Sequence, residues 1–103
     1  MEGKAKEAML NFLKQNHWTD YVLYVESQKP ISKELIIYWL DSVGIVISVM
    51  VDMSFNHSIY YDYTLTVNSF TYFSNETYKS RQEATEAAIK KAVEIYNEKY
   101  KES

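Results

Sequence analysis

The fold is decided by the stretch from Tyr78 to Tyr96, which reads YKSRQEATEAAIKKAVEIY. Ser80, followed three residues later by Glu83, forms a capping box, in which each side chain satisfies a backbone donor at the start of a helix. Small and apolar residues then recur at helical spacing, which places them on one face. They are Ala84, Ala88, Ile89, Ala92, Val93, Tyr96 and Tyr100. The stretch therefore predicts a helix that begins at Ser80 and lays its alanines against a sheet.

Two stretches before this helix alternate apolar and polar residues in the manner of β-strands. They run from Ile45 to Phe55 and from Ile59 to Asn68, and their odd-numbered side chains are expected to point inward. The intervening residues 56–58 predict a hairpin turn. Residues 69–75 are expected to extend or bend the second strand.

Two registers are open for this hairpin. A three-residue loop sets Asp52 directly opposite Asp62, whereas the other register that preserves the faces sets Asp52 opposite Thr64. Facing carboxylates repel each other, so the first register requires solvation, a nearby Lys or Arg, protonation of one carboxylate, or a hard cation such as Ca²⁺ or Mg²⁺. Solvation is the preferred explanation, and Asp52 and Asp62 are the candidate metal ligands.

The first part of the chain predicts a helix and then a strand. Residues 4–16 carry apolar side chains at helical spacing, which indicates about three turns of amphipathic helix. Tyr21 to Glu26 alternates like a strand with one strongly apolar face.

Residues 31–44 fit two structures. As a helix, the segment is capped by Ser32 and ends at Gly44. As a strand, it runs from Leu35 to Leu40 and leads into a type I turn. The strand is favoured, because sequential strands usually pair and an evident strand follows.

These elements predict an α+β domain that spans residues 1–103. An antiparallel sheet of three to five strands is flanked by an N-terminal and a C-terminal helix, in the favoured order α-β-β-β-β-α. Both helices are expected to cover one face of the sheet. The other face stays partly apolar and is the predicted interaction surface, formed by Tyr24, Val46, Met50 and Tyr60.

Composition limits the classes of function. With 103 residues, 47% of them hydrophobic, the chain suits one globular domain. The absence of Cys excludes disulfides and thiolate chemistry and suits the cytoplasm. No apolar run approaches the ~18 residues that span a bilayer, so no membrane association is expected. A net charge of -3 gives no general attraction to nucleic acid.

Catalytic motifs are missing from the sequence. It contains no glycine-rich phosphate loop, no nucleophile elbow and no His-x-x-x-His spacing, and His17 and His57 both fall in predicted turns. We therefore expect neither enzymatic activity nor a cofactor.

Part of the chain resembles a group of small uncharacterised proteins encoded by phages and gut-bacterial genomes. The resemblance rests on Ala8, on residues 12–15 (Phe-Leu-Lys-Gln), on the stretch from Tyr21 to Glu26, and on residues 78–89. Members of the group have a first helix that ends in Trp-Leu-Arg-Glu and a last helix of the Tyr-Glu-Glu-Ala-x-Glu-Ala-Ala type. The resemblance implies an α+β fold but no activity.

The expected order of elements is also similar to that of the double-stranded-RNA-binding domain, whose second helix opens Ser-Lys-Lys-x-Ala-Lys and contacts phosphates. This chain has Ser-Arg-Gln-Glu-Ala-Thr at residues 80–85, so Gln82 and Thr85 replace two cations. Phosphate neutralisation supplies most of the affinity for nucleic acid, which makes RNA binding the second choice. The preferred expectation is a non-catalytic domain that contacts a protein partner or a second copy of itself.

Overall fold

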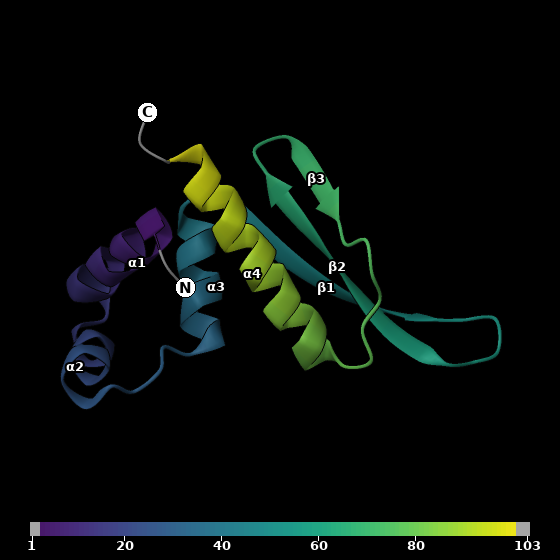
Figure 1. The fold of residues 1–103 in the computed structure, drawn as a ribbon, viewed down its shortest axis with the longest axis horizontal. Helices are drawn as coiled ribbons and strands as arrows, with labels where there is room; N and C mark the ends of the chain where they lie inside the picture. Colours follow the sequence, from purple (N-terminus) through teal and green to yellow (C-terminus); the bar gives the residue numbers. More distant parts are fainter. Residues whose placement is uncertain (1–2, 101–103) are drawn as a thin grey trace.

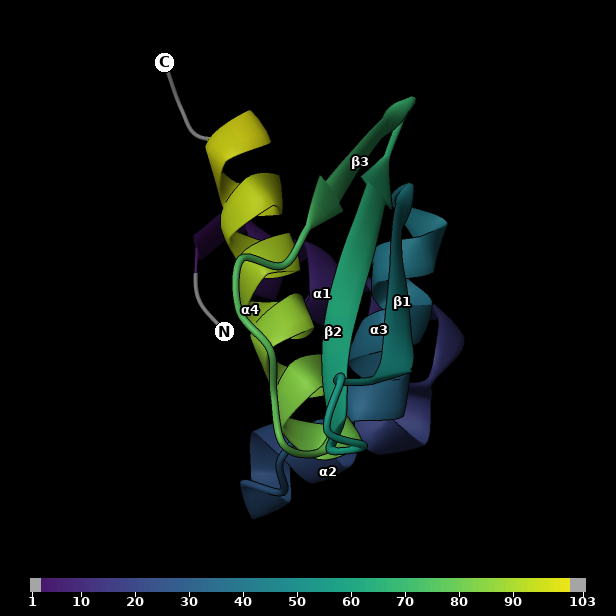
Figure 2. The ribbon, with the colours of Figure 1, turned by 90° about the vertical axis from the view of Figure 1, so that its right-hand side faces the viewer.

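The computed structural model describes residues 3–100 and contains four helices and three strands (Figure 1). The elements in chain order are α1 (Gly3–Asn16), α2 (Trp18–Ser27), α3 (Lys33–Ser42), β1 (Ile45–Met53), β2 (Ile59–Val67), β3 (Phe70–Phe73) and α4 (Arg81–Lys99). The strands form an antiparallel sheet in the order β1-β2-β3 (Figure 2). The α+β class and the antiparallel sheet are therefore as predicted.

The helices lie on one side of the sheet. Helix α4 packs against β1 and β2, α3 packs against β1, and α1 packs against α3 and α4 rather than against the sheet. Trp39, Leu40 and Met9 meet Leu65 in one hydrophobic core. The amide of Ala5 donates to Asn97 Oδ1 at 2.8 Å, which ties the start of α1 to the end of α4.

Helix α4 begins where the capping box predicts. Ser80 is extended (φ -138°), and its Oγ accepts a hydrogen bond from the Glu83 amide at 3.1 Å. The Glu83 carboxylate in turn accepts from the amide of Lys79 at 3.4 Å. The alanine stripe, Ala84, Ala88 and Ala92, is fully buried. Small side chains thus let the α4 backbone approach the sheet closely.

The strand predicted from Tyr21 to Glu26 is wrong, because these residues belong to helix α2. Apolar residues occupy five successive positions, 21–25, so the segment fits a helix as well as a strand. Helical spacing stacks the rings of Trp18 and Tyr21, with centroids 5.4 Å apart. The helix ends at Gln28 (φ 60°), whose amide donates to the Leu23 carbonyl.

The strand favoured for residues 31–44 is also wrong, and the helical alternative is confirmed as α3. Ser32 Oγ accepts from the Leu35 amide at 3.2 Å, and Gly44 follows the helix with a φ of 86°. Trp39 and Leu40 are buried in one core with residues of α4 and the sheet, and this packing favours the helix. The order of elements is therefore α-α-α-β-β-β-α, not α-β-β-β-β-α.

The hairpin adopts neither of the two expected registers. Asp52 pairs with Tyr60, and Met50 pairs with Asp62. The connection is longer than predicted, because β1 ends at Met53 and the amide of Ser54 donates to the Ser58 carbonyl at 2.8 Å. The faces predicted for the two strands are preserved, but the directly opposed carboxylates are not.

Candidate interaction surface

One face of the sheet carries no helix within residues 3–100, and we call it the open face. It contains the even-numbered residues of β1 and β2, and the pairing of Thr64 with Phe73 adds Phe73 from β3. Met50 is 43% exposed and Phe73 is 71% exposed. Its residues include Val46, Met50, Asp52, Tyr60, Asp62 and Phe73. The open face is thus a mixed surface with apolar side chains in contact with solvent.

Three of the four predicted surface residues lie together on the open face. Val46, Met50 and Tyr60 are there, as the alternation of the strands predicts. Tyr24 is elsewhere, because it belongs to α2, which packs on α1. Phe73 was missed, although Asn68 and Ser69 are common turn residues and Asn tolerates the left-handed conformation. Asn68 indeed has a left-handed φ of 58°, and β3 starts directly after this turn.

A second exposed apolar group lies at the far end of the β1–β2 hairpin, which we call the hairpin arm. It consists of Val51, Met53, Phe55 and Ile59, all of which are exposed. The far end of the β1–β2 hairpin extends beyond α4 in Figure 1, which agrees with the exposure of these side chains. The sequence predicts them as inward-facing. Val51, Met53 and Ile59 do lie on the predicted face, but they remain exposed because the hairpin continues past the helices that cover the first half of β1 and the second half of β2.

The polar part of the open face is centred on the Tyr60 hydroxyl. The negative charge of Asp52 raises the pKa of the Tyr60 phenol, and burial and the charge of Asp62 add to this rise. Asp52 Oδ1 also accepts from the Met53 amide at 2.8 Å. Asp62 Oδ1 is buried without a hydrogen-bond partner. The observed register therefore places a phenol opposite Asp52, where the predicted register placed a second carboxylate.

The predicted metal site is not assembled in this arrangement. Asp52 and Asp62 are diagonal neighbours across the ladder, and no group of three or more His, Asp or Glu side chains suited to a metal occurs within residues 3–100. A hard cation needs six or more oxygen ligands, of which the protein usually supplies several. Two diagonal carboxylates do not provide such a set.

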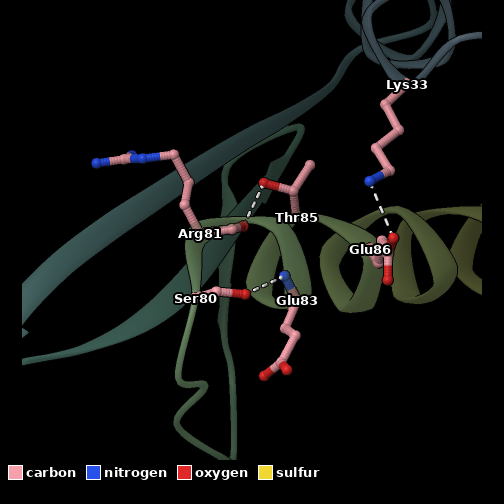
Figure 3. Close-up of polar contacts among 6 residues, drawn as sticks. All are labelled: Lys33, Ser80, Arg81, Glu83, Thr85 and Glu86. Carbon is pink, nitrogen blue, oxygen red and sulfur yellow. Dashed lines mark hydrogen bonds and ion pairs between the residues drawn. The ribbon is translucent and has the colours of Figure 1, made fainter.

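Arg81 at the start of α4 and Lys33 on the neighbouring α3 are both engaged within the protein. The guanidinium carbon of Arg81 lies 5.4 Å from the centroid of the Tyr61 ring. Lys33 Nζ lies 2.9 Å from Glu86 Oε1, and its hydrogen bond and charge lower the pKa of the Glu86 carboxyl (Figure 3). Thr85 Oγ1 donates to the Arg81 carbonyl at 2.8 Å. Arg81 and Lys33 therefore do not form a pair of free positive charges at this end of α4.

An open groove separates β3 from the C-terminal half of α4. Its volume is about 520 Å³, and Phe70, Tyr72, Ile95, Lys91 and Glu94 line it. The lining combines apolar rings with charges of both signs. The groove lies on the helix side of the sheet, because Tyr72 pairs with Leu65 and shares its face.

Comparisons of the chain with protein-family models, with curated proteins and with solved structures gave no significant match. Within residues 3–100, no helix has the length and apolar character needed to cross a membrane.

Proposed function

We propose that this chain is a small, non-catalytic, cytoplasmic domain that acts through protein–protein contacts made by its sheet. The observation that supports the proposal is the exposure of apolar side chains on both sides of the β1–β2 hairpin. Met50 and Val46 are exposed on the open face, and Val51 and Met53 are exposed on the hairpin arm. Contiguous exposed apolar patches on soluble proteins commonly mark interaction sites.

The hairpin suits this role because the core does not depend on its far end. The buried residues of the sheet are Ile45 on β1 and Tyr63, Leu65 and Val67 on β2, all in the half that α3 and α4 cover. The remaining half is free to vary its side chains for recognition. Its partner is either another protein or a second copy of this chain.

RNA binding is the alternative, and one observation favours it. Helix α3, the three strands and α4 follow one another in the helix-strand-strand-strand-helix order of the double-stranded-RNA-binding domain. The charges oppose this alternative. Arg81 lies over Tyr61, and Lys33 pairs with Glu86, so neither side chain is poised for a phosphate.

The experiment compares the tagged chain with its Met50→Lys variant in an extract of the organism that encodes it. Any protein retained by the parent is purified and titrated against both forms. We expect the variant to bind at least about tenfold more weakly, because a charge would be buried in an apolar contact. Gln15→Lys is the matched control, since it adds the same charge at an exposed position of α1.

A parallel titration with duplex and single-stranded RNA separates the two candidate functions. If the chain acts through protein contacts, it should bind neither RNA with an affinity that depends on salt. Salt-dependent binding of RNA, together with partner binding that Met50→Lys leaves intact, would replace the proposal with the alternative.

A further inference from the structure

We propose that two copies of this chain pair antiparallel through the free edge of β1 and form one continuous six-stranded sheet. The inference rests on the proposed function and specifies its partner as a second copy. In the sheet order β1-β2-β3, strand β1 has a neighbour on one side only (Figure 2). Its nine residues, Ile45–Met53, give a long edge for pairing.

Alternate residues of β1 direct their backbone groups to this edge. The amide of Ser54 donates to the carbonyl of Ser58, across from it in the same register, so the even-numbered positions of β1 form the hydrogen-bonded pairs with β2. On β2, Tyr61 exchanges both of its backbone hydrogen bonds with Tyr78, on the side away from β1. The odd-numbered residues of β1 therefore point their N–H and C=O groups outward. These residues are Ile45, Ile47, Val49, Val51 and Met53.

The free edge of β1 lacks the features that usually prevent pairing. Soluble proteins protect edge strands with Lys, Pro, bulges or short length. Strand β1 contains no Pro, Gly, Lys or Arg, and Asp52 is its one charged residue. The opposite edge of the sheet is protected because its strand, β3, is short and has only four residues. The unprotected edge is thus β1.

Two-fold symmetry selects one register as the best for a second copy. Placing the axis at Val49 overlaps all nine residues and pairs Ile47 with Val51 and Ile45 with Met53, so outward-pointing groups meet outward-pointing groups. The same register sets Asp52 opposite Val46 of the second copy. The like charges of the two Asp52 side chains are therefore kept apart.

In this register, the half of β1 that the helices cover in one copy lies beside the half that they leave uncovered in the other copy. Ile45 is 3% exposed beneath its own helices, whereas Val51 is 55% exposed. The two-fold rotation brings the bare end of each strand beside the end that α3 and α4 cover in the other copy. Val51 and Met53 would then lose solvent contact, and this gain is specific to a second copy of the chain.

The test is the oligomeric state of the full chain and of Val51→Pro, measured by sedimentation equilibrium. Proline removes an N–H that faces the free edge, and edge strands tolerate it there without loss of their own ladder. Val51→Ala is the matched control, because it removes apolar surface but retains the N–H. We expect a dimeric parent, a dimeric control and a dissociation constant at least about tenfold higher for Val51→Pro, since both copies lose a donor.

Amide exchange provides a second measurement that needs no variant. The amides of Ile47, Val49 and Val51 should gain protection as the concentration of the parent rises, whereas protection at Val46 and Met50 should already be present at low concentration. A dimer that persists in Val51→Pro, or that gives no such alternation, would show that the copies join elsewhere. A parent that stays monomeric overturns self-pairing but leaves the proposed contact with a different protein intact.

Discussion

Replacing Ala88 by Leu tests how closely α4 approaches the sheet. Ala88 has no exposed surface, and it shares the core with Leu65 and Trp39. Extra methyl and methylene groups in a filled core force neighbouring side chains or the backbone to move, at a typical cost of ~1–3 kcal/mol. For a domain of about 100 residues, each kcal/mol lowers Tm by about 4–8 °C, so we expect a decrease of roughly 4–24 °C.

The assay is urea unfolding, monitored both by circular dichroism and by tryptophan fluorescence. Trp39 is buried and reports on the core, whereas Trp18 is exposed on α2. The midpoint should decrease with no change in the denaturant slope, because the same surface is exposed on unfolding. Lys90→Leu is the control, since it adds a leucine at an exposed position of the same helix. Equal midpoints for Ala88→Leu and the parent would refute the packing of α4 described above.

Three other perturbations test the polar contacts. Ser80→Ala should destabilise the protein by ~1 kcal/mol through loss of the helix cap, and an unchanged urea midpoint would contradict this. The Lys33 contact lowers the pKa of the Glu86 carboxyl, so the stabilisation by this ion pair is complete above the usual carboxyl pKa and is lost as the pH falls through the pKa of Glu86 in the folded protein. The Tm difference between the parent and Lys33→Met should therefore disappear in acid. A difference that stays constant with pH would count against the ion pair. Asp52→Asn should lower the pKa of the Tyr60 phenol, which a tyrosinate absorbance titration against Tyr60→Phe would detect; an unchanged titration would show that Asp52 does not act on this hydroxyl.

The sequence was sufficient for the elements whose local signals agree with each other. The capping box at Ser80 and the alanine spacing of α4 specify the same helix, and the alternation of β1 and β2 specifies their faces. In α2, apolar residues at successive positions fit the period of a strand as well as that of a helix, so the local pattern does not distinguish the two structures. In α3, packing decides: Trp39 meets Tyr96 of α4 edge-on, with centroids 5.0 Å apart. No rule of local sequence contains that contact.

The candidate surface was predictable to the extent that it depends on alternation. Val46, Met50 and Tyr60 follow from the two-residue period of a strand. The exposure of the hairpin arm does not, because it depends on where α4 lies relative to the strands. The register goes with the hydrogen bond between the Ser54 amide and the Ser58 carbonyl, and the connection is longer because Ser54 and Phe55 belong to it and not to β1. Relative to the predicted three-residue loop, the observed register shifts the pairing by two residues and keeps the faces. Asp52 therefore lies opposite Tyr60 instead of Asp62.

The bond between Ala5 and Asn97 brings together two residues that are 92 positions apart in the chain. The start of α1 and the end of α4 are consequently neighbours, and a short linker would join residue 100 to residue 3. New termini belong in the exposed segment of Gln28, Lys29 and Pro30, since exposed loops best tolerate such cuts. The permuted chain would read α3-β1-β2-β3-α4-α1-α2. The sheet and its two covering helices stay an uninterrupted unit, as in the native order, and α1 and α2 become a C-terminal extension that docks on it.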